Sequence, residues 1–397
     1  MIINNSDNQH INLRSYILCL VGYMTLTLSL SLVPYIAIAL KLSTTEVLQA
    51  LSFLFLSYSL SAILLASASD VLGSSKVLTI AQCISMLGLL LITIAQNELM
   101  LYLGFLLTGI GTGPYASIAR AFISRYASNN IELKKAYALL SISLVIAPLL
   151  SAFIAQIALL GTWRLAYLMM FMIELSVFWL MRSMLQRDKT TQQLISWQKI
   201  LHNFVYIFRV KTYLLNLPVL SLCFAFYIQV IMTNIKPLLT TDLGISIISY
   251  NIILVLITSC YIVGILCFRR LAHLSHRAQY RISALCFFAV MTVLFGLLPF
   301  TILNTLICIT LLCFCAGFFV PLSTGSAMQH IQKAHGSAAA TISFAVTFTI
   351  SIWTYVQAHS HFSTYHFILF ALWVTLVASS LLSIIILNVK NTTMPTA

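Results

Sequence analysis

The sequence has very little charge, since only 7% of its 397 residues are Asp, Glu, Lys or Arg. Soluble domains carry about 25% charged residues, and so few charges cannot cover a surface exposed to water. Hydrophobic residues make up 60% of the chain, and they form runs of about 20 residues, the length that crosses a bilayer as a helix. A transmembrane β-barrel is excluded, because its strands alternate apolar and polar residues.

Patterns for several chemistries are also missing. The sequence contains no HExxH, no GxSxG and no paired intramembrane acids, so we expect no enzyme, and it contains no GxxxxGK[ST], so we expect no direct use of ATP. The nine cysteines form no CxxC pair, and we expect them to pack as small apolar side chains. We therefore expect no metal and no other cofactor. The net charge of +13 could suggest a nucleic-acid partner, but the positions of Lys and Arg explain it better, so we expect no such partner.

One basic stretch, from Arg182 to Lys211, divides the apolar sequence into two parts of similar length. We predict an all-α membrane protein with twelve transmembrane helices in two six-helix halves. The halves are residues 1–184 and 212–397, and residues 185–211 form a linker that contains an amphipathic helix. Residues up to Leu13 are polar, and we expect a mobile tail there. The predicted spans are 15–39, 47–69, 77–96, 99–123, 135–159, 164–184, 212–235, 247–268, 280–300, 303–327, 336–357 and 363–388.

The positive charges predict how the chain is oriented. With the N-terminus inside and twelve spans, 18 of the 21 Lys and Arg residues fall on the cytoplasmic side. Only Lys41, Arg164 and Lys236 fall outside. Cytoplasmic loops of membrane proteins are enriched in Lys and Arg, so this asymmetry places both termini in the cytoplasm and accounts for the basic net charge.

The motifs resemble those of the major facilitator superfamily. Between spans 2 and 3, SASDVLGSSKVLT is similar to the superfamily signature G-x-L-a-D-r-x-G-r-r, with Asp70 and Gly73 at matching positions. At the corresponding place in the second half, GILCFRRLAHLSHR has Gly264, Arg269 and Arg270. The resemblance implies the major facilitator fold, in which two halves built from inverted repeats alternate access to a site near the membrane midplane.

Other motifs resemble the drug:proton antiporters of the bicyclomycin-resistance (Bcr/CflA-like) branch. These motifs are TGIGTGPYASIARAF in span 4, APLLSAF in span 5 and HGSAAATISF before span 11, with Gly161, Trp163, Arg164 and Pro321 at further matching positions. Two positions depart from the branch. Thr27 stands where an acid is usual in span 1, and Phe105 stands where an arginine is usual in span 4.

The middle of the first half carries helix-packing signals. Gly109 and Gly113 form a G-x-x-x-G pair, which lets two helix backbones approach closely. Pro148 removes a backbone donor from span 5 and is expected to bend it. Ser151 and Ala152 keep the surface beside it small. In the related family this element is tied to export.

The resemblance also implies a cytoplasmic latch. Asp70 is expected to approach the start of span 11 near Gly336 and Ser337, with Arg120 or Arg125 completing the cluster. A carboxylate at a helix N-terminus is favoured by about 0.3–2 kcal/mol. The alternative is that Asp70 is an ordinary solvated loop residue.

Glu174 is the one carboxylate deep within a predicted span. An intramembrane acid is costly and is therefore a functional candidate. An acid buried there would hold a proton more readily than one in water, so Glu174 could carry a coupling proton. The alternative is a structural acid that is hydrogen-bonded to a neighbour such as Tyr167 or Ser176.

Polar and aromatic residues of the spans that line the cavity in this family are candidates for substrate contact. Such walls bind amphipathic organic molecules through stacking and single hydrogen bonds, although each residue taken alone is more readily explained by packing than by ligand contact. The candidates are Tyr23, Thr27, Ser31, Thr108, Thr112, Tyr115, Tyr227, Gln229, Thr258, Tyr261, Ser323, Thr324 and Trp353.

These observations favour a secondary transporter that exports a small amphipathic organic compound, coupled to protons. Its partners would be this substrate, protons and the lipid bilayer, and we expect a monomer in the cytoplasmic (inner) membrane of a bacterium. Two alternatives stay open. One is uptake of a nutrient or a metal chelate on the same fold, and the other is a membrane sensor or scaffold that transports nothing.

The orientation can be tested with a reporter enzyme that is active only in the cytoplasm. Fusions at Ser196 or after Lys390 should be active, and fusions between Leu239 and Ser246 should be silent. A signal from the last position would contradict the twelve-span orientation.

Overall fold

The computed structural model describes residues 5–127, 129–158, 160–185, 197–296, 301–329, 331, 334–359 and 362–388. These residues are helical apart from short turns, caps and connections. Twelve helices have between 16 and 36 residues, and they correspond one to one to the predicted spans. The prediction of an all-α chain with twelve long helices is confirmed.

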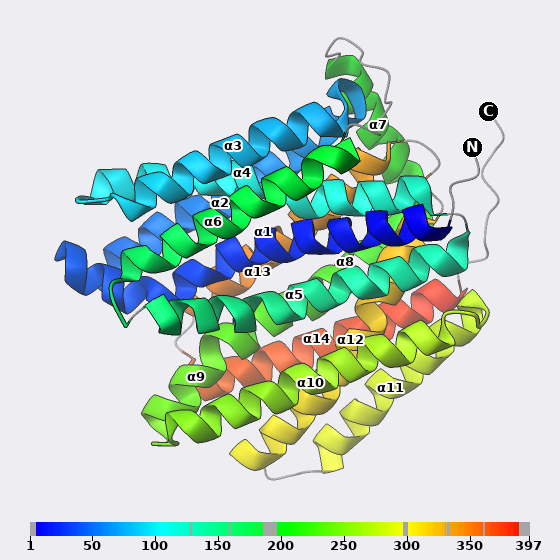
Figure 1. Ribbon diagram of the computed structural model, residues 1–397. Coiled ribbons are helices and arrows are strands. Elements are labelled where there is room, and N and C mark those ends of the chain that lie inside the picture. Colours follow the sequence, from blue (N-terminus) through cyan, green and yellow to red (C-terminus); the bar gives the residue numbers. More distant parts are fainter. Residues whose placement is uncertain are drawn as a thin grey trace. The chain divides into compact units, whose positions relative to one another are not determined.

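Figure 1 shows the helices in their order along the chain. The first seven are α1 (Asn5–Leu40), α2 (Thr44–Leu72), α3 (Ser74–Thr93), α4 (Glu98–Tyr126), α5 (Asn130–Ala158), α6 (Trp163–Leu185) and α7 (Trp197–Arg209). The remaining helices are α8 (Lys211–Phe226), α9 (Ile235–Pro237), α10 (Ile247–Leu271), α11 (His276–Gly296), α12 (Ile302–Met328), α13 (His335–His359) and α14 (Thr364–Asn388). Two π-helical segments, η1 (Tyr227–Asn234) and η2 (Leu238–Asp242), flank α9.

Length and composition suit these helices to a membrane. Among the described residues, nine helices are long and apolar enough to cross a bilayer, and α8 adds a tenth where it follows α7 after a 90° bend. The two other long helices, α11 and α13, have 21 and 25 residues. The outer face of α3 shows the pattern of a lipid-facing surface, since Ile80, Leu87 and Ile94 recur at intervals of two helical turns and are all at least 55% exposed.

Two predicted boundaries need correction. The polar N-terminal residues were expected to form a mobile tail, but α1 begins at Asn5. A helix needs no apolar residues where it extends beyond the bilayer, so composition alone does not mark its start. Span 7 is not a regular α-helix throughout, because α8 changes into the π-helical η1 at Tyr227. The hydroxyl of Thr233 donates to the carbonyl of Ile228, five residues earlier, at 3.3 Å.

The chain forms two compact units. Unit 1 comprises Met1–Asn129, Ile142–Arg209 and Ile331–Phe344. Unit 2 comprises Asn130–Ser141, Val210–His330 and Ala345–Ala397. The beginnings of α5 and α13 fall in a different unit from the rest of each helix. The first turns of each of these helices pack with the unit to which the rest of the helix does not belong.

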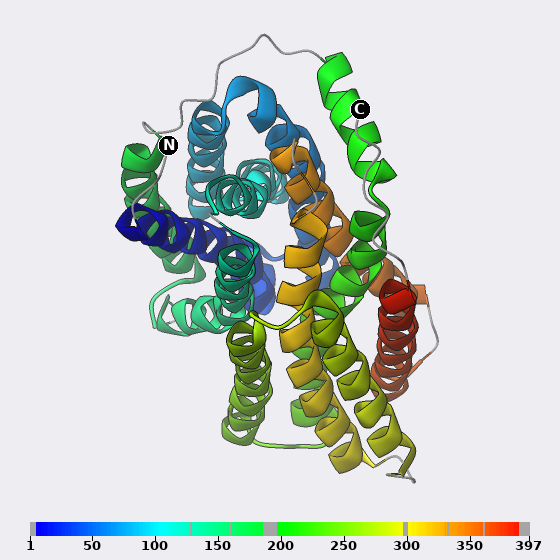
Figure 2. The same ribbon diagram turned by 90° about the vertical axis from the view of Figure 1, so that its right-hand side faces the viewer.

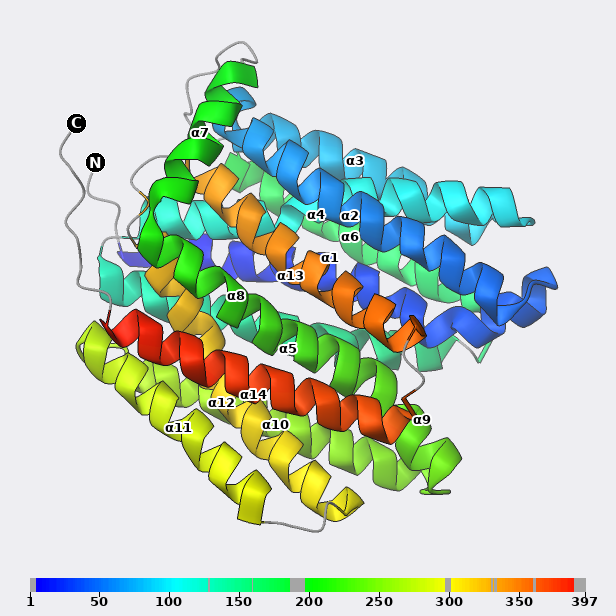
Figure 3. The ribbon, with the colours of Figure 1, turned by 180° about the vertical axis from the view of Figure 1, so that it is seen from behind.

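In unit 1, α4 packs between α2 and α3 (Figures 1 and 3). Glycines make these approaches possible. A Cβ atom on Gly113 would lie 2.5 Å from the carbonyl oxygen of Tyr58 in α2, and one on Gly109 would lie 2.4 Å from that of Leu54. A Cβ on Gly111 would lie 2.3 Å from the backbone nitrogen of Ser85 in α3. The predicted close packing at Gly109 and Gly113 is confirmed, with α2 as the partner.

In unit 2, α12 takes the corresponding position. It contacts α8, α10 and α11, and it lies between α10 and α11 (Figures 2 and 3). A Cβ on Gly264 of α10 would lie 2.1 Å from the carbonyl oxygen of Phe314, and one on Gly317 of α12 would lie 2.1 Å from that of Tyr261. Each unit is therefore built around one helix that is in backbone contact with its neighbours.

The glycine contacts predict how stability responds to one added methyl group. Gly113→Ala should destabilise the protein by about 1–3 kcal/mol, because the new Cβ would meet backbone atoms of α2 that cannot turn aside. Gly161→Ala is the matched control, since its Cβ would come no closer than 3.8 Å to another atom. Thermal unfolding of the detergent-solubilised variants measures both. Equal stability of the two variants would contradict the α2–α4 contact.

Candidate functional site

The carboxylate of Glu174 is fully buried in unit 1, with no exposed surface. Its Oε1 atom accepts a hydrogen bond of 2.6 Å from the hydroxyl of Tyr115 in α4. Its Oε2 atom accepts one of 2.9 Å from the hydroxyl of Ser85 in α3. Glu174 in α6 is therefore held by donors from two neighbouring helices, as a buried carboxylate requires. We call these three residues the Glu174 cluster.

The partners of Glu174 differ from those that the sequence suggested. The hydroxyl of Tyr167 donates to Ser29 at 3.0 Å, and that of Ser176 donates to the backbone carbonyl of Met172 at 2.9 Å. Ser85 gave no signal in the sequence, since it lies 89 residues from Glu174 and comes close only through the packing of α3.

Tyr115 also contacts α1. A Cβ on Gly22 would lie 3.2 Å from the Cβ of Tyr115. The backbone of α1 therefore approaches the same side chain whose hydroxyl binds Glu174. Tyr115 therefore contacts α1 as well as the buried acid.

A second polar cluster in unit 1 surrounds Arg120 of α4, which is only 6% exposed. Its Nη1 donates to the hydroxyl of Ser343 at 2.7 Å, and its Nη2 donates to the hydroxyl of Tyr23 at 3.3 Å. The hydroxyls of Ser343 and Ser117 lie 2.8 Å apart. Tyr23 comes from α1 and Ser343 from the first turns of α13, so Arg120 joins three helices.

The other residues of the predicted latch are placed only in part. Gly336 is buried in the first turn of α13. In that same turn, Nδ1 of His335 lies 2.7 Å from the hydroxyl of Ser124 in α4. The side chain of Asp70 lies outside the described ones, so its contact with Gly336 stays a prediction. Arg120 itself bonds to Ser343 and Tyr23.

The two positions that depart from the antiporter motifs hold neutral groups. The hydroxyl of Thr27 donates to the carbonyl of Tyr23 at 2.8 Å and lies 2.8 Å from the hydroxyl of Ser151 in α5. Phe105 is fully buried and packs edge-on against Tyr167, with 6.4 Å between the ring centroids. Neither position can bind or release a proton.

Pro148 lies inside α5, as predicted. The carbonyl of Pro148 accepts a hydrogen bond of 2.9 Å from Ser151. Ser151 therefore joins α5 to Thr27 of α1, at the surface that the sequence predicted to be lined with small residues.

Most of the remaining cavity candidates of unit 1 donate their side-chain hydrogen bonds to carbonyls of their own helix. The hydroxyls of Thr108 and Thr112 donate to the carbonyls four residues earlier, each at 2.8 Å. A Cβ on Gly88 of α3 would lie 2.5 Å from the Thr108 hydroxyl, so Thr108 packs against α3. Ser31 is half-buried. Buried hydroxyls in a membrane helix commonly satisfy themselves in this way.

In unit 2, the ring of Tyr227 in η1 packs against the ring of Tyr261 in α10, and Thr258 of α10 lies beside Tyr227. The hydroxyls of Tyr227 and Thr258 are 3.5 Å apart, and the rings of Tyr227 and Tyr261 are 5.1 Å apart between centroids. Within the described part of the chain, the buried hydroxyl of Tyr261 has no hydrogen-bond partner. A buried hydroxyl in that state can donate to a bound polar molecule.

Four candidates of unit 2 remain. The hydroxyls of Ser323 and Thr324 donate to carbonyls of α12, each at 2.9 Å. Trp353 is buried, and its indole nitrogen has no partner among the described residues. The side chain of Gln229 lies outside the described ones.

Two polar pairs of unit 2 had no signal in the sequence. Asn234 of η1 donates to Gln357 of α13 at 3.1 Å. Lys134, in the first turns of α5, donates to Gln279 of α11 at 2.8 Å. Both pairs join residues more than 120 positions apart, so only the fold brings them together. Within the described ranges, no three His, Cys, Asp or Glu residues are grouped as metal ligands would be.

The long apolar helices, the two units and the buried polar clusters define a polytopic membrane protein with a transporter fold. Comparison with known families places it further: residues 16–358 match the model of the Major Facilitator Superfamily, and the chain belongs to that family. No curated protein sequence matches the chain. The family match is at the level of the superfamily and does not support the antiporter branch.

Solved structures agree on the fold. The chain is similar to the proton:xylose symporter XylE bound to 6-bromo-6-deoxy-D-glucose, at 15% identity and a TM-score of 0.71, over 96% of this chain and 95% of that one. It is similar to the human organic anion transporter MFSD10 (TETRAN), at 13% identity and a TM-score of 0.65, over 96% and 98%. It is also similar to a bacterial homologue of the iron transporter ferroportin in its outward-facing state, at 14% identity and a TM-score of 0.71, over 95% and 98%.

The Glu174 cluster predicts a difference between two substitutions. Glu174→Gln should change stability little, because the amide keeps an oxygen that Tyr115 can reach. Glu174→Leu should cost about 1–3 kcal/mol for each hydroxyl that it leaves buried and unpaired. Thermal unfolding in detergent compares the two variants. A stable Leu variant would contradict the hydrogen bonds to Tyr115 and Ser85.

Proposed function

We propose that the protein is a secondary active transporter that exports a small amphipathic organic compound by alternating access, coupled to protons. The superfamily supports the transporter class, and the Glu174 cluster is the observation that supports proton coupling. The proposed location is the cytoplasmic membrane of a bacterium, with both termini in the cytoplasm, as the distribution of Lys and Arg predicts.

Glu174 suits a proton carrier because of its surroundings. It is buried among hydroxyl groups that can donate to the ionised form and can also accept from the protonated form. Tyr115 joins it to α1, since the side chain contacts both Glu174 and Gly22. A shift of α1 against α4 would move Tyr115 and alter the proton affinity of the acid. Substrate-dependent movement of α1 could thus be coupled to proton uptake or release.

The proposed gate uses two sets of contacts, each within one unit. In unit 1, Arg120 and Ser117 of α4 hold Ser343 near the start of α13. In unit 2, Lys134 near the start of α5 bonds to Gln279 of α11. Because α5 and α13 each pass from one unit to the other, releasing these bonds would free both helices. Asp70 and Gly336 are proposed to belong to the same gate.

The proposed substrate is an organic molecule with both apolar and polar parts. Tyr227, Tyr261 and Trp353 supply aromatic surface, and the unpartnered groups of Tyr261 and Trp353 can donate hydrogen bonds. The similar solved structures include a sugar symporter, an organic anion transporter and a homologue of an iron transporter, so their cargoes do not narrow the choice.

Export is supported by the antiporter-like motifs, including the span 5 element in which Ser151 contacts Thr27. Uptake of a nutrient or metal chelate is the second candidate. It stays open because the chain departs from those motifs, which weakens the antiporter assignment. The neutral Thr27 and Phe105 would suit the sensor or scaffold that transports nothing. The antiporter branch therefore remains a proposal.

Purified protein in proteoliposomes tests the coupling. With an imposed pH gradient, the wild type should accumulate a substrate found by screening diverse compounds. Glu174→Gln should lose this accumulation and keep downhill exchange, because it cannot change charge but retains the fold. Glu98→Gln, a change of the same kind at the first residue of α4, should transport normally.

The outcomes separate the alternatives. Full pH-driven accumulation by Glu174→Gln would exclude Glu174 as the proton carrier. Accumulation only in the uptake direction would support the importer. If the wild type moves no compound under any gradient, the sensor or scaffold replaces the transporter.

A further inference from the structure

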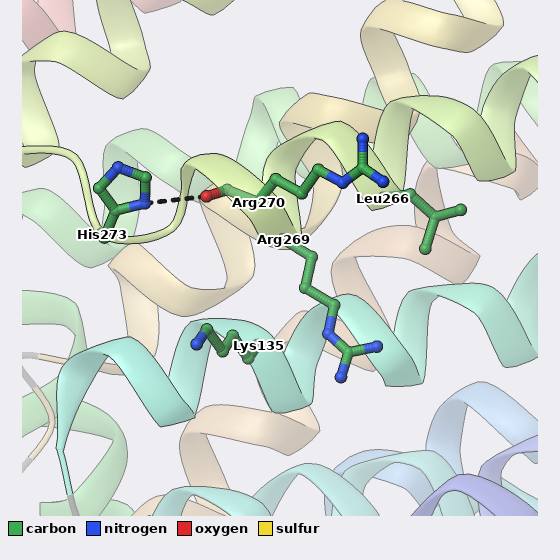
Figure 4. A pocket seen from close by; sticks show the side chains of 5 residues that line it. All are labelled: Lys135, Leu266, Arg269, Arg270 and His273. Carbon is green, nitrogen blue, oxygen red and sulfur yellow. Dashed lines mark hydrogen bonds between the residues drawn. The ribbon is translucent and has the colours of Figure 1, made fainter.

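A basic pocket of about 440 Å³ lies in unit 2 where the end of α10 meets the beginning of α5 (Figure 4). Its lining consists of Lys135, Leu266, Arg269, Arg270 and His273. Three of these residues are cations, one is a histidine, and none is an acid. None of the lining residues belongs to the proposed transport site. Lys134, which the proposed gate uses, precedes Lys135 in the sequence.

The end of α10 positions three of the lining residues. Arg269 and Arg270 occupy the last turn of α10, where positive charge is favoured by the helix dipole. The carbonyl of Arg270 lies 2.8 Å from Nδ1 of His273, which places the imidazole beside the helix end (Figure 4). The helix dipole accounts for the two arginines. It does not account for Lys135, which comes from α5 and adds a like charge to the same space.

Like charges that line one pocket repel each other, and an anion bound between them would remove that repulsion. All three cations are exposed, so an anion from outside the protein can reach them. A phosphate group suits this arrangement, because arginine binds it through two parallel donors and lysine binds it as a point charge.

An apolar surface leads away from this pocket along α10. Ile252, Val255, Leu256, Val263 and Leu266 are between 42% and 65% exposed. Their spacing places them within about one third of the helix circumference, so they share one side of α10. From Ile252 to Leu266 the helix rises roughly 20 Å, which exceeds the depth of one leaflet of a bilayer core about 30 Å thick.

Charge and apolar surface together identify the ligand. We propose that this pocket binds the phosphate of an anionic phospholipid, whose acyl chains lie along the exposed side of α10. Arg269 and Arg270 lie at the end of a candidate membrane span, Ile252–Leu271. The end of a membrane span lies at the depth of the lipid headgroups. Basic pockets at this depth between membrane helices bind anionic headgroups. A soluble phosphate would use the cations but would not need the apolar surface.

The bound lipid would also act on α5. A headgroup held by Lys135 and Arg269 would join the first turns of α5 to α10. The neighbouring Lys134 bonds to Gln279 of α11, so the lipid would strengthen the attachment of these turns to unit 2.

Lipid binding to the purified full-length protein can be measured by native mass spectrometry during titration with phosphatidylglycerol. The double variant Lys135→Gln/Arg269→Gln should bind it roughly 25-fold more weakly, since each juxtamembrane cation contributes about fivefold. Arg277→Gln/Arg281→Gln is the matched control. It removes two exposed cations of α11 that do not line the pocket, and because salt screens exposed charges that do not touch the headgroup, it should bind within about twofold of the wild type.

Three results would overturn the proposal. An equal loss in the control variant would mean that the general positive field of this face attracts the lipid. Equal binding of phosphatidylcholine would mean that the site does not distinguish an anionic headgroup from a zwitterionic one. Glycerol 1-phosphate that binds as tightly as phosphatidylglycerol, with the same loss in the pocket variant, would identify a soluble phosphate as the ligand. Selective, pocket-dependent binding of the anionic lipid supports the proposal.

Discussion

Close backbone contact at glycine is the constraint on which both units depend. In unit 1, Gly109, Gly111 and Gly113 bring α4 against α2 and α3 at distances that no side chain would permit. In unit 2, Gly264 and Gly317 do the same for α10 and α12. In a bilayer, apolar side chains gain little by leaving lipid, so helices associate mainly through such close packing and through polar contacts between them. At these interfaces no side chains interlock. One helix can therefore slide along another while the backbones stay in contact.

The second requirement is to satisfy the few polar groups that the units bury. Glu174 and Arg120 are costly in an apolar interior, and both are surrounded by hydroxyl groups. Hydroxyls suit this purpose because they donate or accept as the charge of their partner demands. A rigid ion pair would fix the charge state of both groups. Hydroxyl partners leave the carboxylate free to change its charge, which a proton carrier needs.

The fold could be predicted from the sequence because its signals are local. Runs of about 20 apolar residues mark each span, and the G-x-x-x-G pair at Gly109 and Gly113 marks a close helix contact. The partners of these groups could not be predicted. Ser85 and Tyr115 lie 89 and 59 residues from Glu174, and no local pattern encodes such pairs. The start of α1 was missed for a different reason, since polar residues outside the bilayer form a helix as readily as they form a tail.

The positions of the two ionisable clusters bear on how they could act together. Tyr115, which binds Glu174, contacts Gly22. Tyr23, the next residue of α1, accepts a hydrogen bond from Arg120. Adjacent residues of one helix therefore touch both buried charges, although Glu174 lies on α6 and Arg120 on α4. Thr27, one turn further along α1, carries no charge. The buried carboxylate lies on α6, and α1 contacts Tyr115, which binds it. In the proposed mechanism, a displacement of α1 would disturb the Glu174 and Arg120 clusters at the same time, so that proton release and opening at α13 follow from one motion.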